Sequence, residues 1–311
     1  MVDDISYTAE EVAKILRISR FTVYELIKRG ELIAYKAGRK MRIDGADLAN
    51  YKKKTKGEAP FVQNTTMPST GSVFDIQTGL IICGQDVVLD ILTRQLERQM
   101  RTIRVLRQYA GSLDGLICLY NRTVNLATVH LWDADTNEYN IPYVRRYLPG
   151  MRATIINLVY RMEGFYVAPG NPKQINSWAD LCRNDVRFVN RERGCGVRVL
   201  IDENLRKLNI DSRHIVGYDK EEMSHLAVAS CVARGAADVG VGTEKAAMQV
   251  QNVEFIPLQK ERYDMVILKQ DLDRPHFQAL IAILRSKAFQ QEVSGMGGYD
   301  ISRMGDVMAE I

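Results

Sequence analysis

Short apolar segments alternate with helix-forming segments through most of this 311-residue chain. Strand-like runs lie at residues 80–83, 126–129, 186–189 and 265–268. Between these runs, apolar residues recur three and four positions apart, which is the period of a helix with one buried face. The longest such pattern, over 88–106, predicts a long helix. Strands separated by helices are typical of α/β domains with mainly parallel sheets, so we predict an α/β body.

Positive charge is concentrated at the start of the chain. The first 56 residues carry 13 lysines and arginines against 8 aspartates and glutamates, whereas the other 255 residues carry 29 against 30. A small basic domain on a nearly neutral body is typical of a nucleic-acid-binding head joined to a second functional unit. The alternative, a solubilising basic tail, does not explain why this segment is strongly patterned.

Composition limits the class of protein. No run of eighteen apolar residues is present, which argues against a transmembrane helix, and the acidic N-terminus does not resemble a signal peptide. The five cysteines are scattered and form no CxxC pair. This pattern argues against a disulfide framework and favours a reducing compartment. We expect a cytoplasmic protein that contacts no membrane.

The basic segment has the pattern of two short helices followed by a hairpin. Thr8 and Glu11 fit a capping box, and Ser19 can cap a second helix that runs to residue 29. Helices joined by so few residues predict a helix-turn-helix. The runs at 31–36 and 40–43 read as two strands around a turn, which would form a basic wing.

These residues resemble a known family of DNA-binding domains. The runs YTAEEVAKIL, SRFTVYELIKRGEL and AYKAGRKMRI are similar to the excisionase-type winged helix-turn-helix, which is related to MerR-type heads. The resemblance implies that the second helix enters the major groove of double-stranded DNA and that the wing contacts the backbone. The DNA-binding candidates are Ser19, Arg20, Thr22, Tyr24, Lys28, Lys36, Arg39, Lys40 and Arg42.

The rest of the chain resembles a ligand-binding family. The stretches HLWDADTNEYNIPYV, GNPKQINSWADL, VRFVNRERGCGVRVLIDENL and GYDKEEMSHLAVASCVARGAADVGVG are similar to the periplasmic-binding-protein-like domain of regulators linked to molybdate or tungstate. The resemblance implies two α/β lobes that close on a ligand. We predict a winged helix-turn-helix domain, a linker and a two-lobed domain. Their expected bounds are 1–54, 55–77 and 78–311, with lobe one at about 78–165 and 255–311 and lobe two at about 166–254.

In such a domain the ligand lies where strands end and helices begin, because helix N-termini offer unpaired amides and partial positive charge. Four places fit: Gly84 to Asp86, Gly111 to Ser112, Arg191 to Arg198, and Ser224 with His225. We expect a small anion there. The ligand-binding candidates are Gln85, Ser112, Arg161, Arg191, Cys195, Gly196, Val197, Arg198, Tyr218 and Ser224.

The third of these places departs from its family. Related domains carry a Gly-Ser-Gly-Thr-Arg run, whereas this chain has glycines at 194 and 196, Cys195, Val197 and Arg198. Backbone amides and Arg198 remain to hold an anion, but the loss of two hydroxyls favours a larger or less polar ligand. A basic, glycine-rich setting can lower the pKa of a cysteine, which would give Cys195 a redox or metal role.

Other groups receive structural roles. His130 and His225 are interpreted as structural histidines rather than ligand contacts. Asp133, Asp135 and Glu138 are interpreted as a polar turn, and we predict neither a metal site nor a cofactor. No GxSxG motif, HExxH motif or P-loop is present, so we predict no catalytic residues and no enzyme activity.

The pattern as a whole predicts a ligand-responsive transcriptional regulator, a homodimer or higher oligomer, that senses molybdate, tungstate, another oxyanion or a small organic anion. Two alternatives remain. One is an enzyme or cofactor-handling protein that uses the two-lobed domain, which turnover of a trapped ligand would favour. The other is an excisionase-like architectural DNA-binding factor, which would need little beyond the head.

Overall fold

The structure is a computed structural model that describes residues 6–16, 18–28, 32–37, 40–45, 47–48, 51–52 and 79–311. The chain divides into two compact units, Met1–Ser72 and Val73–Ile311, and each is described by itself. The predicted linker lies outside the described residues. Within the described part of the chain, no helix is long and apolar enough to cross a membrane.

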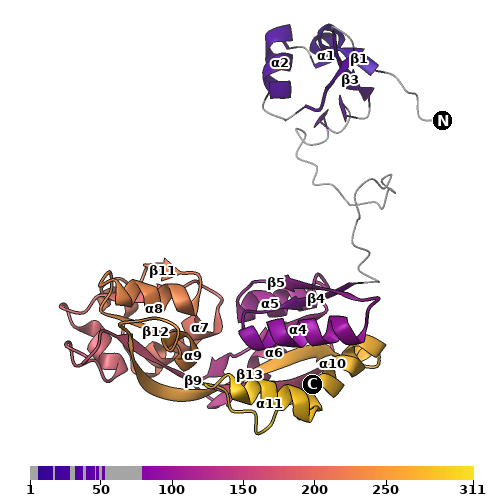
Figure 1. Cartoon of the computed structure of the whole chain (residues 1–311). Helices are drawn as coiled ribbons and strands as arrows, with labels where there is room; N and C mark the ends of the chain where they lie inside the picture. The colour runs from indigo at the N-terminus through magenta and orange to yellow at the C-terminus, as the bar shows by residue number, and fades with distance from the viewer. Residues whose placement is uncertain are drawn as a thin grey trace. The chain divides into compact units, whose positions relative to one another are not determined.

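The first unit is a small winged helix-turn-helix (Figure 1). Two helices pack on a three-stranded antiparallel sheet of order β1-β3-β2, and the strand before the first helix was missed in the sequence. Both predicted caps form: the Thr8 amide donates to Glu11 at 2.7 Å, and the Thr22 amide donates to Ser19 Oγ at 3.0 Å. The elements are β1 (Ser6–Thr8), α1 (Ala9–Leu16), α2 (Arg20–Lys28), β2 (Tyr35–Ala37) and β3 (Lys40–Asp44).

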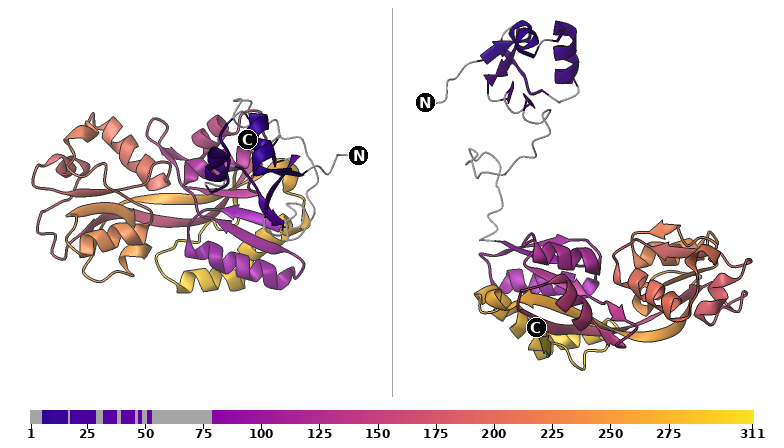
Figure 2. Two further views of the ribbon diagram at one scale, coloured as in Figure 1. Left: turned by 90° about the horizontal axis from the view of Figure 1, so that it is seen from above. Right: turned by 180° about the vertical axis from the view of Figure 1, so that it is seen from behind.

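The second unit is a two-lobed α/β domain built on one long sheet of order β11-β10-β12-β9-β13-β6-β4-β5, with β14 beside β9 (Figures 1 and 2). The outer strands pair in parallel and the central strands pair antiparallel. Lobe one contains β4 (Gly79–Cys83), α4 (Val87–Gln99), β5 (Arg104–Gln108), α5 (Ser112–Tyr120), β6 (Leu126–Val129), β7 (Trp132–Asp133), β8 (Glu138–Tyr139), α6 (Ile141–Tyr147), α10 (Pro275–Arg285), α11 (Lys287–Gly295) and β14 (Val307–Glu310). Lobe two contains β10 (Phe188–Arg191), α7 (Gly196–Lys207), β11 (Glu221–Glu222), α8 (His225–Ala233), β12 (Val239–Thr243) and α9 (Glu244–Ala247).

Two 15-residue strands belong to both lobes. These strands are β9 (Ala153–Val167) and β13 (Glu254–Leu268), and they pair with each other from end to end. Figures 1 and 2 show this ribbon passing from one lobe to the other. Separate apolar cores lie on either side of the crossing, which falls near residues 160–164 and 259–262.

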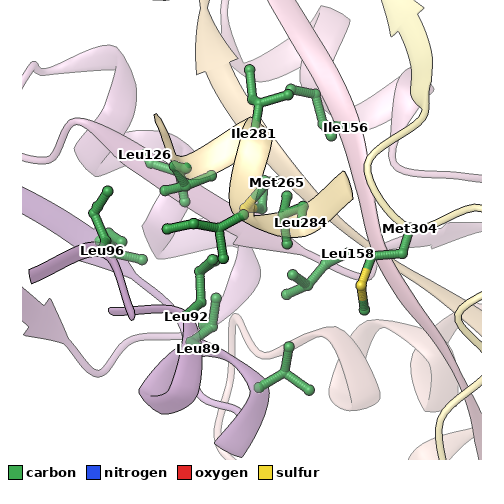
Figure 3. Packing of buried hydrophobic residues seen from close by; sticks show 14 of the residues in the cluster. Leu89, Leu92, Leu96, Leu126, Ile156, Leu158, Met265, Ile281, Leu284 and Met304 are labelled. Carbon is green, nitrogen blue, oxygen red and sulfur yellow. The ribbon is translucent and has the colours of Figure 1, made fainter. Parts of the chain in front are cut away.

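The core of lobe one packs α4 against α10. Leu89, Leu92 and Leu96 face Ile281 and Leu284 of α10 across the buried cluster in Figure 3. The predicted helix over 88–106 is too long, because α4 stops at its C-cap and the chain continues as β5. Apolar residues in that strand happen to continue the helical spacing. The Val88 amide donates to Asp86 at 2.8 Å, which fixes the start of α4.

Candidate functional site

The exposed face of α2 carries most of the candidate DNA contacts that the structure describes. The Arg20 side chain is 58% exposed and pairs with Glu10 at 2.6 Å, and its guanidinium lies 5.6 Å from the Tyr24 ring. The hydroxyls of Ser19 and Thr22 lie 2.8 Å apart and complete the N-cap of the helix.

The wing is described only in part. Arg42 lies on β3, where its Nη1 donates to the Ser6 carbonyl at 3.4 Å. Lys28, Lys36 and Lys40 lie in α2, β2 and β3, but their side chains are outside the described residues, as is the whole of Arg39. The DNA-contacting roles of these residues stay predictions.

One exposed residue of α2 was missed in the sequence. Phe21 is 75% exposed, although large apolar side chains usually avoid water. The signal was available, because Phe21 falls outside the inward stripe of Val23, Leu26 and Ile27. The described part of α2 therefore presents an aromatic pair, Phe21 and Tyr24, beside Arg20.

A pocket in the second unit lies where four helices begin. Gly84 and Gln85 precede α4, Gly111 and Ser112 open α5, Cys195 caps α7, and His225 opens α8. The first two helices belong to lobe one and the last two to lobe two, so the pocket lies between the lobes. Its amide-rich, partly positive surroundings suit an anion. The full lining is Gly84, Gln85, Ala110, Gly111, Ser112, Thr128, His130, Arg191, Glu192, Cys195, His225 and Tyr263.

The two lobes touch each other around this pocket. The Leu113 amide of α5 donates to the Gly194 carbonyl of lobe two at 3.0 Å. Trp132, only 5% exposed, packs on Leu200 of α7. The cavity that remains has a volume of about 20 Å³, which is room for about one water molecule. The structure therefore shows a closed cleft.

Arg191 and Glu192 are an oppositely charged pair in the lining of the pocket. Arg191 ends β10 and is 3% exposed, and it forms a two-pronged ion pair with Glu192 at 2.7 and 2.8 Å. Its Nη1 has no hydrogen-bond partner among the described residues. A buried, unsatisfied guanidinium nitrogen is costly, so this atom is ready to donate to a ligand.

The histidines and the cysteine of the pocket are shielded from water. Burial, reinforced by Arg191, lowers the pKa of His225 well below its ordinary value, so this ring is neutral. Burial raises the pKa of the Cys195 thiol to about 12 despite the nearby arginine. The basic, glycine-rich setting therefore does not lower the pKa of Cys195, because desolvation outweighs the positive charge.

Behind the pocket lies a buried charge network. Arg161 donates to Asp86 at 2.6 Å and to Glu261 at 2.5 Å, and His130 Nδ1 lies 2.7 Å from the other oxygen of Glu261. Burial alone would raise the pKa of Glu261, but Arg161 and His130 outweigh it and hold this pKa at about 2. Burial and the charge of Glu261 raise the pKa of neighbouring Glu163 well above its ordinary value.

The structure brings only some of the predicted ligand residues to the pocket. Gln85, Ser112, Arg191 and Cys195 line it. Gly196 lies beside it, where a Cβ would come within 2.6 Å of the His130 ring, so a glycine is needed for the lobes to approach this closely.

Arg198, which the sequence places in the anion cradle, does not line the pocket. Its guanidinium donates to Glu221 at 2.9 Å and to the Arg191 carbonyl at 3.0 Å, and it lies 4.4 Å from the Tyr218 ring. These partners turn both Arg198 and Tyr218 away from the cleft. Asp202 accepts from the same guanidinium.

Three further candidates also have other neighbours. Val197 is fully buried in the core of lobe two. Ser224 accepts from the Ala227 amide at 3.1 Å and so caps α8. Arg161 belongs to the buried network behind the pocket.

Several pocket residues were given structural roles or missed in the sequence. His130 and His225, interpreted as structural, both line the pocket, as do Thr128, Glu192 and Tyr263. His225 carried a readable signal, because it follows the cap of a predicted helix. His130 and Tyr263 carried none, since only the pairing of β13 with β6 brings them together.

Comparison with known proteins agrees with both units. A family model described as a PBP superfamily domain matches residues 93–285, and a helix-turn-helix family model matches residues 6–56. A relative, the uncharacterized protein YvgK of Bacillus subtilis, is 41% identical over 311 residues, which is the whole of both chains.

Two solved structures share the architecture. A putative phosphate ABC transporter substrate-binding protein with bound phosphate, from Clostridium perfringens, has a TM-score of 0.54 and 13% identity, covering 71% of this chain and 98% of its own. An OxyR variant of Corynebacterium glutamicum with H2O2 bound has a TM-score of 0.51 and 13% identity, covering 93% and 90%. At such identities the likeness concerns the fold alone. The predicted fold class is confirmed: a winged helix-turn-helix and a two-lobed α/β domain of the periplasmic-binding type.

Proposed function

The chain belongs to the PBP superfamily, and we propose that it is a ligand-responsive DNA-binding transcriptional regulator whose cleft closes on a small anion. The helix-turn-helix supports the proposal that double-stranded DNA is a partner, and the two-lobed domain supports the proposal that the protein binds a small ligand. The proposal includes no catalytic step, and it places the protein in the cytoplasm.

The observation that supports an anion is the buried Nη1 of Arg191, which has no hydrogen-bond partner among the described residues; Arg191 lines a pocket formed by four helix N-termini. Each such terminus presents backbone N–H groups and a partial positive charge. The neutral ring of His225 and the Ser112 hydroxyl add polar groups without adding charge. This set favours a compact oxyanion over a cation or an apolar ligand.

The cavity sets a limit on ligand size in the closed state. The observed cavity, of about 20 Å³, leaves room only for a compact ligand, and the lobes must open for one to enter. Molybdate, tungstate, phosphate and sulfate share the required shape and charge. Cys195 and Val197 lack the hydroxyls that related domains carry, so small organic anions are also candidates. Titration distinguishes among these ligands.

The test is calorimetric titration of the full-length protein with molybdate, tungstate, phosphate, sulfate and small carboxylates. We expect at least one to bind, and Arg191→Gln to weaken it by about 10- to 150-fold, as expected for one charge-assisted hydrogen bond. The matched control is Arg193→Gln, because the Arg193 side chain is 81% exposed and does not line the pocket. Equal losses in both variants, or no binding of any anion, would refute the anion site.

The response to ligand requires a second measurement. DNA selected from a random duplex pool is titrated with the protein by fluorescence anisotropy, with and without the anion that binds. A ligand changes DNA affinity only if it favours one arrangement of the heads over another. We propose a homodimer or higher oligomer for this reason, which light scattering tests. Unchanged DNA affinity on anion binding would refute the regulatory role while leaving the anion site intact.

A further inference from the structure

Three metal-ligating side chains meet where the two long strands cross between the lobes. One ligand atom from each of His130, Glu163 and Glu261 lies within 4.8 Å of the other two. His130 follows β6, while Glu163 lies in β9 and Glu261 in the adjacent strand β13. The residues are far apart in sequence, so no sequence motif predicts the cluster. Its members are drawn together only by the pairing of the central strands.

Glu163 is the unexplained member of the cluster. Its side chain is fully buried, and neither of its oxygens accepts a hydrogen bond from a donor among the residues that the structure describes. With a proton on Glu163, its only hydrogen-bond partner among these residues is the acceptor Glu261. A buried carboxylate without a partner is strongly unfavourable, so native structures supply one. The groups within reach are His130 and a second carboxylate, Glu261.

The local charge has an excess of negative groups. Arg161 is the cation of this network, and it already contacts Asp86 and Glu261. Glu163 is a third carboxyl group beside it, and burial together with Glu261 raises its pKa well above the ordinary value, so a bound cation would have to displace its proton. Arg191 offsets part of this negative charge, although its guanidinium is also paired with Glu192.

We propose that His130, Glu163 and Glu261 bind a divalent transition-metal cation, with Zn²⁺ as the reference ion, at the crossing of β9 and β13. One imidazole nitrogen and two carboxylate oxygens are a ligand set that zinc and its neighbours accept. Typical metal–ligand distances of about 2.0–2.2 Å require the three side chains to move together only slightly. The ion would balance the negative charge and give the Glu163 oxygens a partner. This site is separate from the proposed anion pocket, although His130 borders both.

Equilibrium dialysis tests the proposal on the tag-free full-length protein. The protein is first stripped with EDTA and then dialysed against about 1 μM free Zn²⁺, and bound zinc is counted by elemental analysis. We expect one zinc ion per chain. Titration with Co²⁺ should give visible absorption bands that Zn²⁺ abolishes by competition.

The decisive variant is Glu163→Gln, which keeps the shape of the side chain and removes its charge. We expect it to weaken zinc binding at least 10-fold. The matched control is Glu138→Gln, which removes a partly buried carboxylate from the β7–β8 hairpin and should leave zinc binding unchanged. Because a core variant can fail to fold, the melting temperature of each is measured, and His130→Gln serves as a second test of the same site.

The outcomes separate cleanly. Zinc bound by the wild type and the Glu138 variant, and lost in the Glu163 and His130 variants, supports the site. Less than 0.1 zinc per folded wild-type chain overturns it, and Glu163 then carries a proton instead. Zinc bound equally by folded Glu163→Gln overturns it too, and places the ion elsewhere. None of these results depends on anion or DNA binding, so the proposed regulatory function stands or falls separately.

Discussion

Gly111→Ala tests whether the cleft works by closing. A Cβ at this position would come within 2.6 Å of the Gly194 carbonyl oxygen and 2.8 Å of the Cys195 amide, both backbone atoms of the other lobe. Ordinary contacts need about 3.5 Å, so the lobes must separate locally by about 1 Å. The backbone of Gly111 has φ −68° and ψ 166°, which alanine adopts without strain.

The expected loss follows from the contacts that separation breaks. The 3.0 Å bond from Leu113 to Gly194 would be lost, at about 1 kcal/mol, and the packing of Trp132 on Leu200 would loosen. A closed state weakened by about 1–3 kcal/mol lowers anion affinity by about 5- to 150-fold. DNA affinity without ligand should not change.

The assay is calorimetric titration with the anion that binds the wild type best, together with thermal unfolding. Gly295→Ala is the control, because a Cβ there meets nothing within 4 Å in the described part of the chain. If Gly111→Ala binds the anion as the wild type does, closure through this contact is not part of binding. A large fall in melting temperature would instead show that the substitution disrupts lobe one.

Three further outcomes are expected. Trp132→Ala should reduce both the melting temperature and anion affinity, because truncating a buried tryptophan costs about 3–5 kcal/mol; scanning calorimetry and titration measure the two effects. Arg20→Ala should weaken a selected DNA site more than random DNA, by about 1–3 kcal/mol in anisotropy titrations, if this arginine reads a base. The free energy of unfolding should fall as the pH drops below about 6.5, because His225 takes up a proton only when unfolded. His225 contributes at most about 1.4 kcal/mol per pH unit to this pH dependence. Urea unfolding measured at several pH values should show that His225→Asn has lost this contribution.

The contrast between Arg191 and Arg198 shows which features of the site could be predicted from the sequence and which could not. The glycines at 194 and 196 correctly indicated a helix start at the cleft, because the backbone conformation at a helix start depends on the residues at that place in the sequence. Which arginine lines the pocket depends on residues distant in the sequence. Arg198 is turned away by Glu221 and Tyr218, which lie more than fifteen residues further along the chain.

The helix caps and the end of α4 show the same difference between features that local residues determine and features that they do not. Thr8 and Ser19 were predicted as helix caps, and both make the expected bonds. The end of α4 was missed because apolar spacing alone does not distinguish a helix from the strand that follows it. The cluster of His130, Glu163 and Glu261 was missed because these residues are brought together only by strand pairing.

The paired strands β9 and β13 give the cleft an elastic connection. A hinge made of loops swings freely, but two strands bonded along their whole length resist bending and twisting together. The register shifts between Pro257 and Gln259 and between Tyr263 and Asp264 interrupt this ladder on either side of the crossing, so bending concentrates there. Any opening of the cleft therefore has to bend both strands together, because they are paired across the crossing.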